Sequence, residues 1–244
     1  MLFSFLQKKI EPNLSFLGVD MHSHLLPGID DGAEIVQQTV DFAKALQQIG
    51  YRKLICTPHI LSGVHNNNPF IIKNALAKAQ AALLESNVSI ELAAAAEYMV
   101  DESLEILIDS NEELLTFGKD YMLIEMSYVM AARNIKEVIF KLRMKDIMPI
   151  IAHPERYNYY HKNFDAYYSL KERDVLFQVN LLSLSGYYGK EIKKVAERLV
   201  NENLVEFIGT DMHHQRHLDF TNEYVRTKEF YKLLETKNLL NHTL

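Results

Sequence analysis

Seven short runs of apolar residues recur along the chain, and helical patterns separate most of them. The runs are SFLGVDMH, RKLICTPH, SIELAAAAEYM, YMLIEMSY, IMPIIAHPE, VLFQVNLLSL and LVEFIGTDMHH. Between two of them, an amphipathic helix is predicted by the apolar stripe of Ile192, Val195, Ala196 and Leu199. Strands that alternate with helices in units of roughly thirty residues predict parallel β/α units, in an open sheet or a closed barrel.

Two further helices have recognisable ends. One is predicted by the apolar face of Val36, Val40, Ala43 and Leu46. Gly50 is expected to cap its C-terminus. Pro69 opens the segment FIIKNALAKAQAALLES, at a position where a first helical turn accepts proline. Because no Pro/Ser-rich linker or composition shift divides the chain, we expect one domain over residues 1–244, with residues 1–17 as an N-terminal extension.

Six of the seven runs end in a histidine or a carboxylate. These residues are, in chain order, His22, His24, His59, Glu97, Glu125, His153, Asp211 and His213. The sixth run has Asn180 near its end. Because the C-terminal ends of parallel strands meet at one rim, we expect these side chains to form a ring there. Alternation along a strand also places His22 and His24 on the same side.

A single histidine or glutamate near a strand end is usually a hydrogen-bonded or solvated residue. Glu97 and Glu125 are harder to explain in this way, because each lies within an apolar run. A buried carboxylate without a partner is costly and tends to take up a proton. Cations bound at the rim would remove that cost. One of the adjacent aspartates Asp30 and Asp31 adds a ninth donor to the set.

Nine nitrogen and oxygen donors exceed the four ligands of one tetrahedral ion. They suit two or three divalent ions that share carboxylate ligands. Mixed imidazole and carboxylate ligation, without a thiolate, fits Mn, Fe or Zn. Ions roughly 3.5–4 Å apart commonly support in-line displacement at phosphorus. The ring therefore predicts a hydrolase acting on a phosphate ester.

Two arginines are candidates for binding the phosphate. Arg156 in AHPER lies three residues after a predicted ligand, and its planar fork suits phosphate oxygens. The alternative for Arg156 is a structural salt bridge with Glu155 or another acid. Arg216 in GTDMHHQRH is a second candidate, although a loop arginine is usually only solvated. The remaining histidines of the loops are expected at the surface, namely His65, His161, His214 and His217.

Composition excludes several other functions. The net charge is −6 without a Lys/Arg block, so nucleic-acid binding is not expected. No apolar run approaches the ~18 residues of a membrane span. The single cysteine, Cys56, excludes an internal disulfide and suits a reducing compartment. The start, MLFSFLQKKI, is too short for a signal peptide, so we expect a cytoplasmic enzyme whose apolar tip is a candidate contact for a membrane or a partner.

Several segments together resemble the polymerase-and-histidinol-phosphatase (PHP) superfamily. Within it, they are similar to the CpsB/CapC type of bacterial protein-tyrosine phosphatase, which is associated with capsule and exopolysaccharide loci. The segments are DMHSHLLPGIDDGA, CTPHI, AAEYM, IEMSY, AHPERY, NLLSLSGYYG and GTDMHH, within residues 20–214. The resemblance implies a distorted seven-stranded β/α barrel, a cluster of usually three ions with Mn the first choice, and hydrolysis of phosphotyrosine on a cognate bacterial tyrosine kinase with a tyrosine-rich tail.

The resemblance also implies roles for individual residues. It selects Asp31 rather than Asp30 as a ligand, and it makes Arg156 the phosphate-binding arginine. A second family arginine follows the last Asp-x-His motif, but the corresponding loop around Arg216 is shortened here. Asp20 is expected to orient a ligand histidine from behind. The implied ligands are His22, His24, Asp31, His59, Glu97, Glu125, His153, Asp211 and His213.

The working hypothesis is in-line attack on phosphorus by a metal-bridged hydroxide, with Arg156 holding the equatorial oxygens. A cysteine-nucleophile mechanism needs C-x5-R, and Ser62 stands at the arginine position after Cys56. Tyr128 and Tyr157 are candidates for lining the approach to the metals. Two alternatives stay open: a histidinol-phosphate or other small phosphomonoester hydrolase of the same superfamily, and a non-catalytic, metal-stabilised scaffold that binds a kinase tail.

Overall fold

The strands form two sheets in which every pairing is parallel, in a computed structural model that describes residues 10–110 and 112–244. The smaller sheet has the order β1 (Val19–Ser23), β2 (Lys53–Cys56), β4 (Glu91–Ala94). The larger sheet has the order β3 (His59–Ile60), β5 (Glu97–Met99), β6 (Tyr121–Glu125), β7 (Met148–Ala152), β8 (Leu176–Asn180), β9 (Phe207–Gly209). The α/β class with parallel sheets is therefore confirmed.

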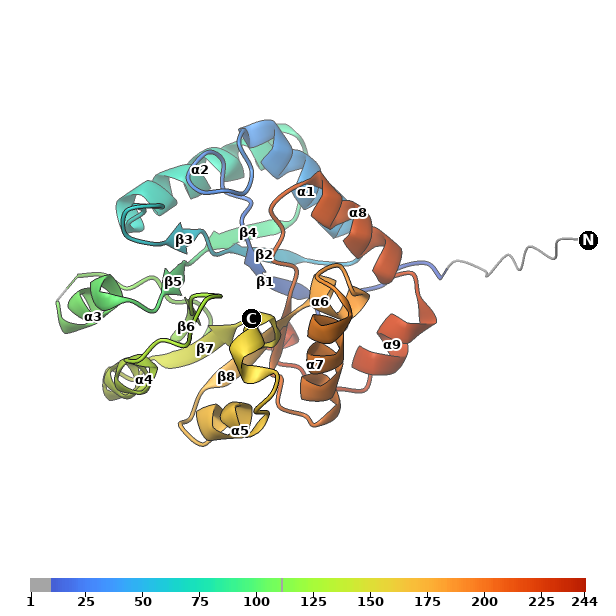
Figure 1. The fold of residues 1–244 in the computed structure, drawn as a ribbon. Helices are drawn as coiled ribbons and strands as arrows, with labels where there is room; N and C mark the ends of the chain where they lie inside the picture. The colour runs from blue at the N-terminus through green and yellow to red at the C-terminus, as the bar shows by residue number, and fades with distance from the viewer. Residues whose placement is uncertain (1–9, 111) are drawn as a thin grey trace, which may run out of the picture.

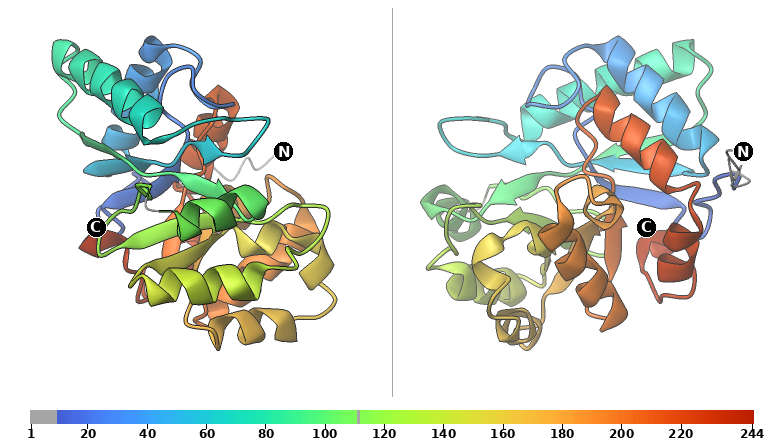
Figure 2. Two further views of the ribbon diagram at one scale, coloured as in Figure 1. Left: turned by 90° about the vertical axis from the view of Figure 1, so that its left-hand side faces the viewer. Right: turned by 45° about the vertical axis from the view of Figure 1, so that its right-hand side comes forward.

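Helices lie around the outside of the strands (Figures 1 and 2). They are α1 (Val36–Gln48), α2 (Pro69–Glu85), α3 (Glu102–Asp109), α4 (Ile135–Met144), α5 (Asp165–Lys171), α6 (Leu181–Ser185), α7 (Lys190–Asn201), α8 (Gln215–Tyr224) and α9 (Lys228–Leu234). Pro69 occupies the first position of α2, as predicted. Helix α1 ends one residue earlier than expected, with Ile49 at its C-cap and Gly50 following at a φ of 112°.

The seven predicted runs all contain strands, but two of them break. The second run forms β2 and β3, and the third forms β4 and β5, so each contributes one strand to each sheet. Pro58 lies at the first break, where its missing N–H and fixed φ interrupt a ladder. No strand ladder joins β1 to β9 in the described residues, so the expected closed, seven-stranded barrel is not seen as one sheet.

The two sheets nevertheless meet at the C-terminal ends of β1 and β9. The backbone N–H of Asp211 donates to the carbonyl of His22 at 2.8 Å. The backbone N–H of His24 donates to the carbonyl of Met212, also at 2.8 Å. Consequently the last residues of the chain's first and final strands lie next to each other, as a barrel-like arrangement requires.

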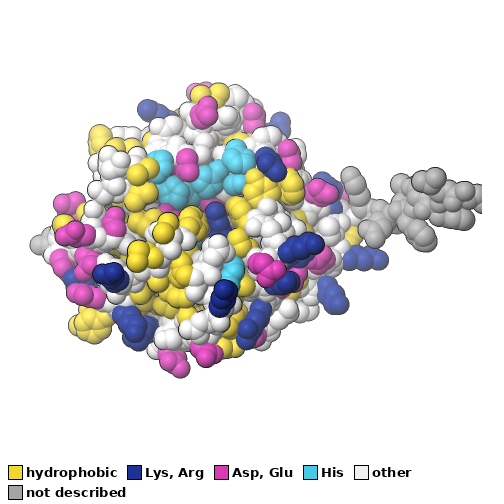
Figure 3. Space-filling model, in the orientation of Figure 1, with side chains coloured by type: hydrophobic (Ala, Val, Ile, Leu, Met, Phe, Trp, Pro, Cys, Tyr) yellow, Lys and Arg dark blue, Asp and Glu magenta, His cyan; other side chains and the backbone are white. Residues whose placement is uncertain are grey.

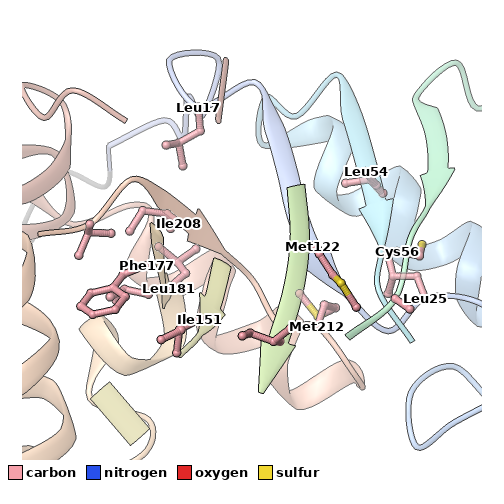
Figure 4. Close-up of a cluster of buried hydrophobic side chains, with 14 of the residues drawn as sticks. Leu17, Leu25, Leu54, Cys56, Met122, Ile151, Phe177, Leu181, Ile208 and Met212 are labelled. Atoms are coloured by element: carbon pink, nitrogen blue, oxygen red, sulfur yellow. The ribbon is translucent and has the colours of Figure 1, made fainter. Parts of the chain in front are cut away.

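Both faces of the larger sheet are buried, which is usual for parallel strands. Along β7, Ile151 packs in the large cluster between strands and helices, whereas Ile150 packs in a smaller cluster on the opposite face. Figure 4 shows part of the large cluster, where Phe177 and Ile208 come from β8 and β9. Because apolar contacts surround the strands, their ends are held at defined positions.

The N-terminal segment is only partly described. Residues 1–9, which include the predicted apolar tip, lie outside the described residues. Within the rest of the predicted extension, Leu14 and Leu17 are fully buried, and the backbone N–H of Leu14 donates to the carbonyl of Ile49 at 2.8 Å. None of the helices in residues 10–110 and 112–244 has the length and apolar character to cross a bilayer.

Candidate active site

All nine predicted ligands converge on one region. They form four overlapping groups whose ligand atoms lie within 4.8 Å of one another: His24, Asp31, His59 and His213; His22, His24 and Asp211; His22, Glu97 and His153; His59, Glu97 and Glu125. Every predicted ligand belongs to at least one group, and no other described residue does. On the surface, histidine side chains form a band across the face shown in Figure 3.

Glu97, the first residue of β5, connects the groups. Its side chain is fully buried. One carboxylate oxygen, Oε2, lies 3.2 Å from His22 Nε2 and 3.3 Å from His59 Nδ1. The same oxygen is 3.4 Å from His24 Nε2. The other oxygen, Oε1, lies 3.1 Å from His153 Nε2. A carboxylate shared among four imidazoles has the geometry of a ligand that bridges two ions.

The distances between the ligand atoms of the ring are compatible with shared metal ions. His59 Nδ1 is 2.9 Å from Glu125 Oε1, yet neither this nitrogen nor Glu97 Oε1 forms a hydrogen bond within the described part of the chain. Two donors each about 2.1 Å from one ion lie about 3.0 Å apart at a right angle and about 3.4 Å apart at a tetrahedral angle. The nine residues, all of which offer nitrogen or oxygen donors, therefore fit divalent ions.

Two of the histidines are oriented by acceptors behind them. His22 Nδ1 lies 2.7 Å from Gln178 Oε1, and His24 Nδ1 lies 2.8 Å from Asp30 Oδ2. These oxygens can only accept, so each Nδ1 carries a proton and each Nε2 is the nitrogen that faces the centre of the site. The tautomer that a metal ligand needs is thus set by residues outside the ring.

Gln178 was not predicted, and it takes the role expected of Asp20. Asp20 is fully buried, but its carboxylate accepts from the backbone N–H of Thr210 at 2.9 Å and from the Thr210 hydroxyl. Asp20 therefore holds the residue before Asp211 rather than a ligand histidine. A polar residue inside the apolar run VLFQVN is the signal that could have identified Gln178.

The two adjacent aspartates have different positions. The Asp30 carboxylate accepts a hydrogen bond from His24 Nδ1, and it also accepts a long one from the backbone N–H of His59, at 3.3 Å. Asp31 has a half-exposed side chain, and its Oδ1 lies 3.5 Å from His213 Nε2 and 3.6 Å from His59 Nε2. The geometry therefore agrees with the choice of Asp31 as the ligand and gives Asp30 an orienting role.

The backbone at two strand ends is unusual. His153 follows β7 with a φ of 33°, and Asp211 follows β9 with a φ of 51°. Non-glycine residues in this left-handed region are strained, and such strain concentrates at functional sites. Close packing adds a further constraint at Gly209, where a Cβ atom would lie 2.7 Å from His22 Cβ and 2.8 Å from Gln178 Nε2. Only glycine leaves room for both side chains there.

Arg156 lies beside the ring between two aromatic rings. Its Nη1 donates to Asp211 Oδ2 at 2.9 Å. The guanidinium carbon is 4.7 Å from the ring centroid of Tyr128 and 4.3 Å from that of Tyr188. The salt bridge considered from the sequence is therefore present, but its acid is Asp211. Glu155 is buried and accepts from the backbone N–H of Asn180 at 2.9 Å instead. Arg156 is therefore held rigidly, with its remaining N–H groups available to a ligand.

The second candidate arginine lies outside this arrangement. Arg216 is exposed on α8, and its guanidinium carbon is 5.3 Å from the ring centroid of Tyr187. It is not among the described residues that line the cleft above the ring. The structure therefore brings Arg156 to the site and leaves Arg216 at its periphery.

Not all of the loop histidines are surface residues. His214 is exposed, as predicted. His65 is half-buried and stacks on His59, with 5.4 Å between ring centroids. The prediction for His217 is wrong, because its side chain is buried under Tyr187 and its Nδ1 lies 3.2 Å from the Asp211 carbonyl. Burial lowers the pKa of His217 to about 4, so it is neutral at physiological pH.

A cleft of about 600 Å³ opens above the ring. Six of the nine predicted ligands line it, while His22, His24 and Glu97 are fully buried beneath. Tyr128 and Tyr188 form part of its wall. The other expected aromatic residue, Tyr157, does not line the cleft: it is fully buried, its hydroxyl accepting from Met126 N–H and donating to the Ala152 carbonyl.

Electrostatics favour positive charge at the base of this cleft. Burial by itself would lower the pKa of His22, but the charges of Glu97 and Asp211 outweigh burial and raise that pKa to about 9. The same carboxylates would attract divalent cations. Cys56, by contrast, is fully buried, and burial raises the pKa of its thiol to about 12, so it is no nucleophile.

The sequence is similar to those of known proteins. Residues 18–229 match the family described as capsular polysaccharide synthesis, CpsB/CapC. The chain is 30% identical over 230 residues to the tyrosine-protein phosphatase YwqE of Bacillus subtilis, covering 91% of each chain. It is 26% identical over 202 residues to the tyrosine-protein phosphatase CpsB of Streptococcus pneumoniae, covering 80% of this chain and 82% of the relative.

Solved structures share the architecture. One match comes from crystal structures of YwqE from B. subtilis and CpsB from S. pneumoniae, which are described as unique metal-dependent tyrosine phosphatases. This solved chain matches the present one with a TM-score of 0.80. Its identity is 28%, over 92% of this chain and 94% of the other. A histidinol phosphate phosphatase from Lactococcus lactis, complexed with zinc, L-histidinol and phosphate, matches with a TM-score of 0.53 at 11% identity, over 85% and 92%. This second likeness shows a shared fold alone.

Glu97→Gln should release metal while keeping the side-chain shape. We expect the variant to lose most of its bound ions and its hydrolytic activity, because the amide cannot bridge two cations. Added Mn²⁺ should raise the melting temperature of the wild type but not of the variant, since ions that bind only the folded state stabilise it by mass action. Metal analysis and thermal melts check this, with the exposed Glu91→Gln as control. Full metal content and rate would remove Glu97 from the ligands.

Asp31→Asn should affect one ion only. Asp31 belongs to a single group and is the most exposed of the nine, so we expect the metal content to fall by roughly one ion and turnover to slow. The ions held by Glu97 should stay bound. Metal content after gel filtration checks the expectation, with the exposed Asp41→Asn as control. An unchanged metal content would transfer the ligand role from Asp31 to Asp30.

Proposed function

Because this chain belongs to the CpsB/CapC family of capsular polysaccharide synthesis proteins, we propose that it is a metal-dependent phosphatase that hydrolyses phosphotyrosine in proteins. One observation carries the proposal: nine nitrogen and oxygen donors converge around Glu97 at the base of a cleft that also contains Arg156. The proposed cofactors are two or three divalent ions, with Mn²⁺ the first choice.

When bound, the ions would lower the pKa of a water molecule and offset the negative charge of the phosphoryl group. The chain's own residues contribute position and charge. Arg156, fixed by Asp211 and by the rings of Tyr128 and Tyr188, directs its free N–H groups at phosphoryl oxygens. Because these contacts exist before the substrate arrives, little reorganisation is needed in the transition state.

The walls of the cleft suit a phenyl ring. Tyr128 has an exposed fraction of 44%, so the part of its ring that Arg156 and His153 leave uncovered can contact the ring of a phosphotyrosine. Tyr188 lies on the other side of Arg156 and also lines the cleft. A tyrosinate leaving group also needs less protonation as it departs than the alkoxide of an alkyl phosphate does, because a phenol has a pKa of about 10.

We further propose that the physiological substrate is the tyrosine-rich tail of a cognate bacterial tyrosine kinase. Support comes from the relatives, which are named tyrosine-protein phosphatases, and from the family's description as capsular polysaccharide synthesis proteins. A peptide tail in an extended conformation can insert a tyrosine side chain to the base of an open cleft. Histidinol phosphate is the competing substrate, and the experiment below decides between the two.

Aryl phosphates should be hydrolysed faster than alkyl phosphates. In this site the histidines and carboxylates of the ring are assigned to metals, so we expect weak protonation of the leaving group. A phosphotyrosine peptide should therefore have a higher kcat than the same peptide with phosphoserine. Its kcat should also far exceed the kcat for histidinol phosphate. A series of substituted phenyl phosphates separates chemistry from binding, because a chemical cause makes the rate fall as the phenol pKa rises. Faster hydrolysis of histidinol phosphate than of phosphotyrosine would overturn the proposal.

Arg156→Lys should weaken phosphate recognition although it keeps the charge. An ammonium group can still pair with Asp211, but it cannot present a planar fork to two phosphoryl oxygens. We expect kcat/KM for a phosphotyrosine peptide to fall about 100-fold, similar to the loss of one oriented donor. Steady-state kinetics at saturating Mn²⁺ measure this, with the exposed Arg173→Lys as control. Wild-type kinetics would reduce Arg156 to a structural partner of Asp211.

A further inference from the structure

A second cavity lies next to the catalytic cleft. It has a volume of about 330 Å³ and lies between β3 with the loop that follows it and helix α3. Its floor is apolar, because Ile60, Met99, Leu104 and Leu107 line it. Leu104 is buried in the core, whereas Ile106 at the edge has an exposed fraction of 64%. An exposed isoleucine beside an apolar hollow is a surface that gains from being covered.

The two hollows adjoin each other. His65 and Met99 line both of them. His65 in turn stacks on His59, one of the proposed metal ligands. A molecule bound at the metals therefore reaches the apolar cavity if it continues past His65 and Met99.

Two of the polar side chains around the second cavity already form hydrogen bonds. The Asp101 carboxylate accepts from the backbone N–H of Leu104 at 3.0 Å. The Asn67 amide donates to the carbonyls of Ile29 and His59 at 2.9 and 2.8 Å. The cavity therefore offers mainly apolar contact to a ligand.

The charge beside the cavity selects against acidic ligands. Asp101, which caps the N-terminus of helix α3, lines the cavity. An acidic side chain placed in this cavity would lose water to apolar walls and would face the Asp101 carboxylate. An aliphatic side chain would meet neither cost.

We propose that this cavity is a substrate subsite that binds an aliphatic side chain flanking the phosphotyrosine of a peptide substrate. The inference rests on the proposed phosphatase function and specifies its substrate class. An extended peptide advances about 3.3 Å per residue, so a side chain two or three positions from the phosphotyrosine spans the width of the His65 ring. The subsite then distinguishes tyrosines with an aliphatic neighbour from tyrosines within acidic or small-residue sequence.

Peptide libraries with one variable position test the preference. Phosphotyrosine peptides carry Leu, Ser or Asp in turn at each of the three positions on either side, and kcat/KM is measured with the Mn²⁺-loaded protein. We expect Leu at one position to exceed Ser by about tenfold, the size typical of one apolar side chain entering a pocket. Asp at that position should be the poorest. Equal rates for Leu, Ser and Asp at every position would overturn the subsite.

Two variants connect the preference with the cavity. Ile106→Gln removes the apolar edge, and Ser103→Phe fills the cavity, so both should abolish the Leu preference by raising KM for the Leu peptide. Neither should change hydrolysis of para-nitrophenyl phosphate, which is too small to reach past His65. Leu84→Gln is the matched control, because Leu84 is also an exposed apolar helix residue, on α2, and it lines neither hollow.

The small substrate also separates the two proposals. If para-nitrophenyl phosphate and all phosphotyrosine peptides are left intact by the metal-loaded protein, the phosphatase proposal fails. If they are hydrolysed but the Leu preference survives in both cavity variants, the phosphatase proposal stands and the subsite is wrong. Circular dichroism of each variant verifies that the fold is intact before either conclusion is drawn.

Discussion

Buried negative charge at the strand ends is the constraint on which the rest of the site depends. Glu97 and Asp211 are almost completely enclosed, and a carboxylate in such a place is unfavourable unless cations surround it. Four imidazoles contact Glu97, and Arg156 pairs with Asp211. The negative charge of these buried carboxylates is unfavourable without partners, and the same charge attracts divalent ions. We therefore expect stability and metal binding to be coupled in this protein.

The fold supplies the rigidity that this charge cluster requires. Strands buried on both faces fix the positions from which the ligands project. That rigidity holds His153 and Asp211 in left-handed backbone conformations, and it allows His22 and Gln178 to pack against Gly209 without a Cβ between them. A polar chain from Gln178 to Asn180 and on to Asp211 then connects the ring to the arginine. Each of these features costs some free energy, and the packed core offsets it.

Recognition of the substrate uses other residues. The ring of proposed metal ligands could serve many phosphate esters, so selectivity has to come from the walls above it. Tyr128 and Tyr188 line the catalytic cleft, whereas Ile106 belongs to the apolar cavity beside it. These three residues lie in loops or on the short helix α3, where sequence can change without disturbing the strands. The proposed function thus combines a fixed metal site with a variable surface.

The sequence, together with the family resemblance that selected Asp31, determined the β/α order and all nine donors that converge. This was possible because strand ends in parallel sheets meet at one rim, and because Glu97 and Glu125 interrupt apolar runs. It did not determine every strand end, because His59 and Glu97 begin β3 and β5 after the breaks instead of ending a strand. Only the tertiary structure decided that Gln178 rather than Asp20 orients a histidine, that His217 and Tyr157 are buried, and that the second and third runs each break between two sheets. The physical reason is that periodicity is local, whereas the partner of a side chain can be distant in sequence, as for Asp20 and Thr210, which are 190 positions apart.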